Sequence, residues 1–160
     1  MKKIIFILSI LLISNNCLAA GSSNDGATEI DLYKAAKKLI LRAKKLEKKD
    51  KIDKALKLYS KAYKRLIKAY KKDKKNPDIL NYLGFTLRKK GDYEKGEEYY
   101  LLGLQIDPNH KGINEYLGEL YVVTDRIDLA KERLNVLKNC NCEEYIELKE
   151  IIEGKKKSKY

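Results

Sequence analysis

The residues that could carry chemistry in this 160-residue chain are few, because it has three cysteines and a single histidine. Cys140 and Cys142 flank Asn141, a spacing open to a disulfide, a metal half-site or a redox pair. A zinc site needs about four ligands, and His110 is the only other nitrogen or sulfur candidate beyond the N-terminal segment. We therefore expect neither a metal nor a cofactor. A local disulfide that holds the last turn is the favoured interpretation, with free thiols and redox chemistry as alternatives.

A histidine acts as a general base only when a nucleophile and an orienting partner lie nearby. His110 stands between Asn109 and Lys111, and no catalytic arrangement of serine, cysteine or aspartate is recognisable around it. We expect an ordinary surface or capping histidine. With no other catalytic motif present, the sequence argues against an enzyme, and no small-molecule substrate is expected.

Charge is distributed unevenly along the chain, although the total is +12. Residues 34–75 hold 19 basic and 4 acidic residues, whereas residues 76–153 hold 10 basic and 16 acidic residues. Lysine outnumbers arginine 30 to 5, which argues against phosphate recognition because the arginine fork suits phosphate better. The basic block is interpreted as a solvated face of long helices. Attraction to an anionic envelope surface or an acidic partner is the alternative, and nucleic acid is not expected.

The first twenty residues have the pattern of an export signal. A basic start precedes a short apolar stretch, and Ala19 and Ala20 supply the small residues of a cleavage site. The apolar stretch is about half of the roughly 20 residues that a membrane span needs. Cys17 raises lipid attachment as an alternative, but Asn16 before it is not the small residue that lipidation favours. We predict a cleaved signal peptide at 1–20 and a periplasmic or secreted protein without a transmembrane helix.

Apolar residues recur at helical spacing through the rest of the chain. Leu39, Ala43 and Leu46 step by four and three residues, which indicates one apolar face of a helix. Side chains that accept hydrogen bonds from free backbone N–H groups are expected before three helices, the first of which has Pro77 at its first position. The expected capping residues are Asn76, Asp92 and Asp125.

A period of 34 residues relates two segments in the second half. Tyr82-Leu83-Gly84 recurs as Tyr116-Leu117-Gly118, and the small residues Gly96 and Ala130 also match. A fixed period in a helical pattern indicates stacked helical hairpins. Glycine inside a helix costs about 1 kcal/mol relative to alanine. We therefore expect the two helices of each pair to approach closely at these small residues, with Tyr100 filling the groove beside the contact.

These positions resemble the tetratricopeptide repeat (TPR) family, and more narrowly a family of small exported bacterial TPR proteins with a C-terminal cysteine pair. The resemblance implies an all-α fold, an α-solenoid of about three TPR helical hairpins plus a C-terminal capping helix. The repeat-defining packing residues are Leu83, Gly84, Gly96, Tyr100, Pro108, Leu117, Gly118 and Ala130.

The predicted organisation follows from these boundaries. The segments are a signal peptide at 1–20, a flexible leader at 21–30, a TPR domain at 31–153 and a basic tail at 154–160. Within the domain the expected parts are repeats at 36–69, 77–110 and 111–144 and a capping helix at 143–153. The first repeat starts 41 residues before Pro77, seven more than the period. Its second helix should therefore be about two turns longer than usual.

In a TPR array the first helix of each pair lines a concave groove, and the resemblance implies a partner-binding site there. The expected groove residues are Asn81, Phe85, Arg88, Lys89, Glu115, Glu119 and Val122. We expect an exported, non-catalytic scaffold that binds a protein or peptide partner. The alternative is electrostatic docking of the lysine-rich helices on an anionic lipid or polymer. Replacement of Phe85 and Arg88 by alanine is expected to leave thermal stability nearly unchanged.

Overall fold

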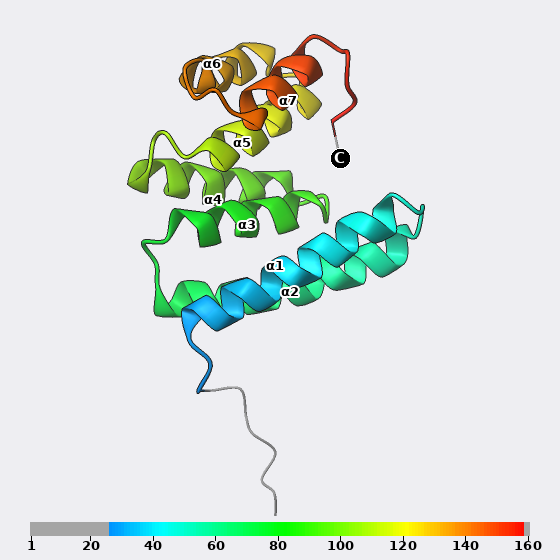
Figure 1. The fold of residues 1–160 in the computed structure, drawn as a ribbon, viewed down its shortest axis with the longest axis vertical. Helices are drawn as coiled ribbons and strands as arrows, with labels where there is room; N and C mark the ends of the chain where they lie inside the picture. Colours follow the sequence, from blue (N-terminus) through cyan, green and yellow to red (C-terminus); the bar gives the residue numbers. More distant parts are fainter. Residues whose placement is uncertain (1–25, 159–160) are drawn as a thin grey trace, which may run out of the picture.

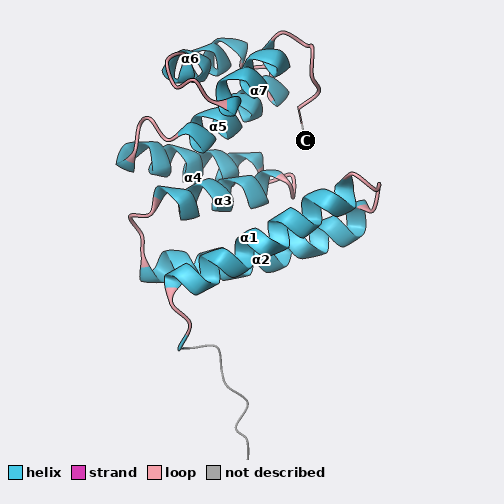
Figure 2. Ribbon diagram, viewed as in Figure 1, coloured by secondary structure: helices cyan, strands magenta, loops and turns pink. Residues whose placement is uncertain are grey.

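The computed structural model describes residues 26–158, and these residues form seven helices and no strand (Figures 1 and 2). The predicted signal peptide at 1–20, with Cys17, lies outside the described residues. The helices are α1 (Glu29–Glu47), α2 (Ile52–Lys72), α3 (Pro77–Arg88), α4 (Tyr93–Ile106), α5 (Lys111–Val123), α6 (Ile127–Leu137) and α7 (Glu143–Ile152).

Consecutive helices form hairpins that stack in chain order (Figure 1). α1 packs on α2, α3 on α4 and α5 on α6, and α7 closes the far end against α5 and α6. The buried Leu148 and Ile151 of α7 cover the end of the stack, which an array of repeats needs because its last apolar surface would otherwise be wet. The all-α solenoid predicted from the sequence is confirmed.

Two of the three predicted N-caps are confirmed. Asn76 and Asp92 each accept a hydrogen bond at 3.3 Å from the backbone N–H three residues later, and Pro77 occupies the first turn of α3. The prediction for Asp125 is wrong. The N-cap of α6 is Arg126, which makes no side-chain cap bond. Asp125 instead has a φ of 59° and forms the bend before the cap.

The three hairpin turns share one feature, a residue with positive φ two positions before the second helix. These residues are Asp50, Gly91 and Asp125, with φ values of 55°, 84° and 59°. Glycine enters this left-handed region freely, and aspartate does so more easily than most residues. The shared turn places each second helix in a similar way against its first helix, so the hairpins can stack as repeats.

The first hairpin begins earlier than predicted and is longer than the others. Thr28 and Asp31 form a capping box, in which the Thr28 side chain accepts from the Asp31 N–H at 3.1 Å. α1 therefore starts at Glu29, and the last two residues of the leader predicted at 21–30 are helical instead. α2 has 21 residues against 14 in α4, which confirms the expected two extra turns.

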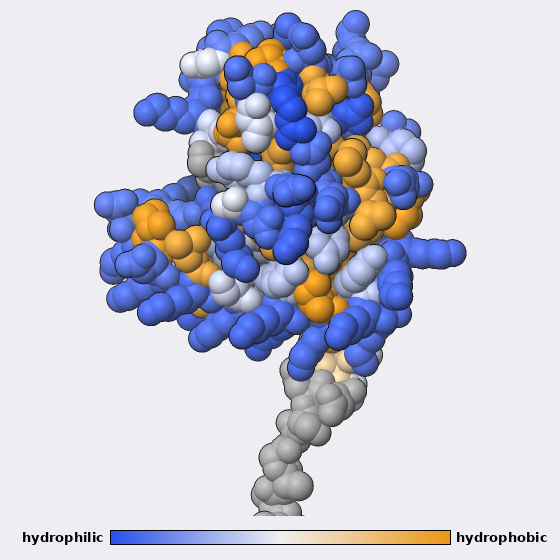
Figure 3. Space-filling view, turned by 180° about the vertical axis from the view of Figure 1, so that it is seen from behind, coloured by the Kyte–Doolittle hydropathy of each residue, from blue (hydrophilic) through white to orange (hydrophobic). Residues whose placement is uncertain are grey.

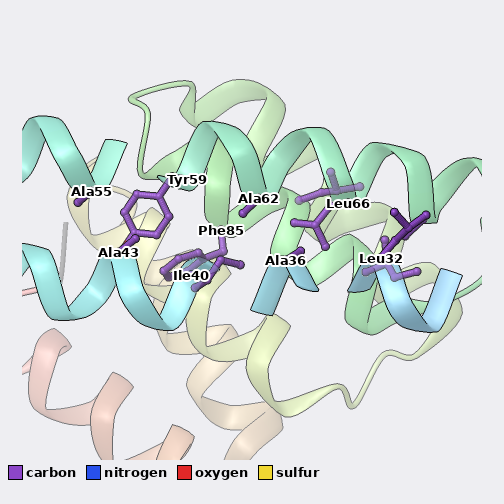
Figure 4. Close-up of a cluster of buried hydrophobic side chains, with 12 residues drawn as sticks. Leu32, Ala36, Ile40, Ala43, Ala55, Tyr59, Ala62, Leu66 and Phe85 are labelled. Atoms are coloured by element: carbon purple, nitrogen blue, oxygen red, sulfur yellow. The ribbon is translucent and has the colours of Figure 1, made fainter. Parts of the chain in front are cut away.

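The core of the first hairpin includes small residues from both of its helices. Ala36 and Ala43 of α1 and Ala55 of α2 are fully buried, so the two helices approach closely. Tyr59 of α2 and Phe85 of α3 belong to the same cluster (Figure 4). Their rings meet edge to face with centres 5.8 Å apart. This contact joins the first hairpin to the second.

Close helix contact at the glycines takes two forms. A Cβ on Gly84 would lie 2.6 Å from the ring of Tyr100 and 2.8 Å from the carbonyl oxygen of Gly96, so a side chain does not fit there. This is the close approach of α3 and α4 that the sequence indicates. Gly118 differs, because a Cβ there would lie 2.5 Å from Leu148 of α7. The small residue in α5 makes room for the closing helix rather than for α6.

Candidate functional site

The inner face of the stack, formed by α1, α3, α5 and α7, carries a continuous row of aromatic side chains. The ring centre of Tyr33 in α1 lies 5.9 Å from that of Tyr82 in α3. Tyr82 lies 6.3 Å from Phe85, and Phe85 lies 5.1 Å from Tyr116 in α5. Tilted and edge-on contacts at such separations are favourable between aromatic rings. We call these four residues the aromatic row, and it connects all three hairpins.

Lysines of α1 lie over the aromatic row. Lys37 Nζ lies 5.2 Å from the centre of the Tyr33 ring, and Lys44 Nζ lies 4.6 Å from the centre of the Phe85 ring. Both distances are within the range of cation–π attraction. Lys44 also donates to the Tyr116 hydroxyl at 3.3 Å, and burial raises the pKa of Tyr116, so this hydroxyl stays neutral. The α1 side of the inner face therefore combines apolar rings with positive charge.

A fully buried ion pair lies at the centre of the inner face. Arg88 Nη2 donates to Glu119 Oε2 at 2.9 Å, and both side chains are 0% exposed. Arg88 also donates to the backbone carbonyl of Tyr116. Charges taken out of water are tolerated only when they are paired and hydrogen-bonded. The pair therefore fixes α3 to α5 beside the aromatic row.

A hollow of about 450 Å³ opens where α3, α5 and α7 begin. Its lining includes four carboxylates and one lysine, together with polar and aromatic side chains of α3 and α5. A surface recess in which one sign of charge predominates concentrates ions of the opposite sign, so this hollow, with four carboxylates against one lysine, favours a cation. The carboxylates are those of Asp78, Asp107, Glu115 and Glu144, and the lysine is Lys111.

His110 lies at the edge of this hollow and caps α5. Its Nδ1 accepts a hydrogen bond from the backbone N–H of Ile113 at 3.1 Å, which confirms the expected surface or capping role. Its Nε2 lies 3.5 Å from Asp78 Oδ1. The hydrogen bond from His110 holds the pKa of Asp78 below its usual value. His110 thereby connects the start of α5 to the start of α3.

The groove residues predicted from the sequence lie on α3 and α5 or directly after α3, but most are not open to solvent. Lys89 and Val122 are half-buried, and Lys89 Nζ lies 2.5 Å from Glu47 Oε1. Phe85 and Arg88 are each 1% exposed, so the expectation that both can be replaced without loss of stability is wrong. Partner binding by the set stays a prediction. The buried members are Asn81, Phe85, Arg88, Glu115 and Glu119.

Several inner-face residues are absent from the sequence-based set. Tyr33, Lys37 and Lys44 occupy one side of α1 at spacings of four and seven residues, a helical signal visible in the sequence. The expected start of the first repeat at residue 36 leaves Tyr33 outside the repeat, so the spacing is not recognised as one side of its first helix. Tyr82 and Tyr116 are equivalent under the 34-residue period. In the sequence both residues mark the repeat, and this role does not by itself indicate a binding surface.

A second charged surface lies on the outer side of α2. Six exposed lysines recur there at alternating spacings of three and four residues, which places them along one side of the helix. Figure 3 shows hydrophilic residues over most of the end of the molecule that α1 and α2 form. We call this set the lysine stripe. Its members are Lys54, Lys57, Lys61, Lys64, Lys68 and Lys71.

The cysteine pair lies in the turn before α7. The Sγ atoms of Cys140 and Cys142 are adjacent, their Cα atoms are 5.2 Å apart, and Cys142 is the N-cap of α7. Within residues 26–158 no group of histidine, cysteine, aspartate or glutamate side chains is arranged to hold a metal ion. In the same part of the chain, no helix combines the length and apolarity that crossing a membrane requires.

Sequence comparison identifies one segment of the chain. Residues 77–110 match the tetratricopeptide repeat family, and this is the span of the second repeat expected from the sequence. No curated protein matches the chain.

Solved structures resemble the whole stack. The second TPR domain of the human RPAP3 protein, solved with an HSP70 peptide, has 15% identity and a TM-score of 0.51, covering 78% of this chain and 98% of that domain. The Yersinia enterocolitica type III secretion chaperone SycD, solved with a peptide of the translocator YopD, has 18% identity and a TM-score of 0.52, covering 74% and 86%. A TPR protein from Parabacteroides merdae has 16% identity and a TM-score of 0.52, covering 76% and 61%. At these identities the similarity concerns the fold.

Proposed function

We propose that this chain is a non-catalytic TPR-type scaffold that binds an extended segment of a partner protein along its inner face. The aromatic row is the observation that carries the proposal. Three of its rings are only half-buried, so they offer apolar contact area on a side that all three hairpins share. Burial of a partner against the rings would supply affinity. Lysines on α1 and carboxylates on α5 would orient it.

Similar structures support the mode of binding rather than the partner. The RPAP3 domain and SycD were each solved with a peptide of another protein. A shared fold leaves the ligand open, so the partner of this chain has to be inferred from its own side chains. Those side chains form a surface that is aromatic and cationic near α1 and acidic near α5 and α7.

Site-specific photo-crosslinking tests the proposal. A photoreactive phenylalanine analogue replaces Tyr33 on the inner face or, as a matched control, the exposed Leu101 of α4, and both variants are irradiated in the native cell. We expect one discrete partner to be captured at position 33 and not at position 101. Lys37→Glu should lower that capture because it reverses the charge beside the ring. Equal capture at both positions would refute the inner-face assignment.

We also propose that the chain is exported and that Cys140 and Cys142 form a disulfide. The export pattern of residues 1–20 supports the first statement, and the adjacent Sγ atoms support the second. In an oxidising compartment such a pair would stay oxidised. Intact mass measurement of the protein from its native cell should give a chain that begins after Ala19 or Ala20. That chain should be two hydrogens lighter than its reduced form, and a full-length chain with three alkylatable thiols, Cys17 included, would contradict both statements.

The lysine stripe favours a second candidate function, docking on an anionic envelope surface. Each lysine held near anionic lipid contributes about 1 kcal/mol, and the six members of the stripe are all exposed on one side of α2. Sedimentation with vesicles that contain anionic lipid should therefore pull down the protein at low salt and release it at moderate salt. Lys57→Glu with Lys64→Glu should abolish sedimentation. Absence from the vesicles at low salt would exclude this function and leave the groove function untouched.

A further inference from the structure

The C-terminal tail turns back toward the stack after α7. Gly154 has a φ of +69°, and the N–H groups of Lys155 and Lys156 both donate to the carbonyl oxygen of Glu150, at 2.9 and 3.2 Å. A left-handed glycine directly after a helix reverses the direction of the chain and satisfies its last carbonyls. The tail therefore turns back past the end of α7 (Figure 1).

Two side-chain contacts place the tail on the inner face. Lys156 Nζ lies 2.5 Å from Glu147 Oε2 of α7. Ser158 Oγ donates to Glu119 Oε2 of α5 at 3.1 Å. The same Glu119 oxygen accepts from Arg88 at 2.9 Å, so the tail reaches the ion pair at the centre of the inner face.

The carboxylates that hold the tail belong to a longer row on α5 and α7, in which Glu115 and Glu119 are buried and Glu147 is partly exposed. Glu115 and Glu119 are one turn apart on α5, and Glu144 and Glu147 are nearly one turn apart on α7, so each pair lies on one side of its helix. We call these four residues the acidic wall. Tail contacts fall on Glu119 and Glu147, whereas Glu115 and Glu144 line the 450 Å³ hollow beside them. The wall therefore continues past the end of the described tail.

We propose that the acidic wall binds an extended segment that carries a lysine and, two residues later, a hydroxyl side chain, and that residues 154–158 are its intramolecular occupant. The inference rests on the proposed function, because it names the chemistry of the partner for the same inner face. The pattern is that of the seated tail, in which Lys156 reaches Glu147 and Ser158 reaches Glu119. A partner with the same spacing makes the same two contacts and displaces the tail.

The positions of charged residues on the inner face support a lysine-bearing partner. Lys37 and Lys44 lie on α1 over the aromatic row, so a lysine-bearing segment is repelled from the α1 side and attracted to α5 and α7. Glu147 and Lys156 are partly exposed, with 27% and 36% of their side chains accessible. Contacts of this kind are weak and salt-dependent one at a time. The tail holds its place because it is tethered.

The covalent attachment of the tail determines how strongly it competes with a free segment for the acidic wall. A short flexible connection gives an effective concentration on the order of 1 mM. If the free segment has a Kd of about 0.1 mM, the tethered tail weakens binding from solution by about tenfold. Releasing the tail should remove this competition.

The test uses the full chain and a fluorescent synthetic peptide with the sequence of residues 153–160, EGKKKSKY. The release variant carries Lys156→Ala and Ser158→Ala, which remove the attraction to Glu147 and the donor to Glu119. Fluorescence anisotropy at low salt should show the peptide binding the release variant about tenfold more tightly than the unchanged chain. Adding Glu147→Lys to the release variant should abolish binding, and circular dichroism should show equal helix content in all three proteins.

Each outcome decides the proposal. Tighter binding to the release variant, lost with Glu147→Lys, supports it. Absence of binding to the release variant overturns it, as does equal binding to the release variant and the unchanged chain or binding that survives Glu147→Lys. Photo-crosslinking at Tyr33 separates this failure from failure of the proposed function. If the release variant and the unchanged chain both capture a partner at position 33 but neither binds the peptide, the scaffold function is supported. The acidic wall is then not its binding site.

Discussion

The buried pair of Arg88 and Glu119 allows a direct test of how the inner face is held together. Glu119→Gln preserves the shape of the side chain but leaves the Arg88 charge without its counter-ion. Because both side chains are 0% exposed, the guanidinium has no water to replace its counter-ion in the folded chain. Removing one partner of a buried pair costs about 3–5 kcal/mol. Glutamine still accepts a hydrogen bond, so we expect the free energy of unfolding to fall by about 3 kcal/mol, at the low end of this range.

Glu97→Gln is the matched control for this substitution. Glu97 accepts two hydrogen bonds from Arg126, at 2.9 and 2.7 Å. This pair is also arginine to glutamate, but its side chains are 20% and 36% exposed. An exposed pair of this kind contributes about 1 kcal/mol or less. The two variants therefore differ mainly in burial.

Urea unfolding followed by circular dichroism measures both variants against the unchanged chain. We expect equal m-values and a large fall in midpoint for Glu119→Gln alone, with Tm lowered by about 10 °C, since about 1 kcal/mol shifts Tm by roughly 3–4 °C in a domain of this size. Adding Arg88→Met should recover part of the loss because it removes the unpaired charge, although the Tyr116 carbonyl then loses a donor. Similar losses for Glu119→Gln and Glu97→Gln would refute the argument from burial.

Four further substitutions test other parts of the structure. Gly84→Ala should lower the free energy of unfolding by about 1–3 kcal/mol, because the new Cβ meets a buried ring and a backbone carbonyl. Gly118→Ala meets only the flexible end of a leucine on α7 and should cost less; urea titration ranks the two. Gly91→Ala should cost about 1–2 kcal/mol because its φ is +84°, and an unchanged Tm would contradict the left-handed turn. The pKa of Asp78 is held low in the folded state, first by its hydrogen bond with His110. Its contribution to stability is therefore present above the unfolded pKa and lost as pH falls through the folded pKa, below about pH 4. Asp78→Asn should flatten this acid loss, and an unaltered pH profile of Tm would contradict the assignment.

The fold can be predicted from the sequence at positions where only a few residue types satisfy the local structure. Asn76 and Pro77 mark a helix start in the sequence, and Gly84 and Gly96 mark a contact too close for side chains. Asp125 shows the limit of such local arguments, because the same residue type serves as an N-cap or as a left-handed turn residue. Only the geometry of the hairpin turn decides between the two.

The candidate site was less predictable because it depends on packing between distant segments. Phe85 lies on the expected side of α3, yet rings of α2 and α5 cover it. Glu119 has the spacing of a groove residue, but Arg88 and Ser158 both bind it, from 31 residues before and 39 residues after. Helical periodicity assigns a residue to one side of its own helix. It does not show what another part of the chain places over that side.

Net charge is a poor guide to the partner because the inner face changes sign along the stack. Lys37 and Lys44 make the α1 end cationic, whereas Glu144 and Glu147 contribute carboxylates near α7. An extended segment lying across the aromatic row would experience both signs in order. Charge complementarity fixes the register and direction of binding more than it raises affinity. A segment with its lysines toward α7 and an acidic end toward α1 should therefore bind in one direction, and its charge-reversed sequence should not compete.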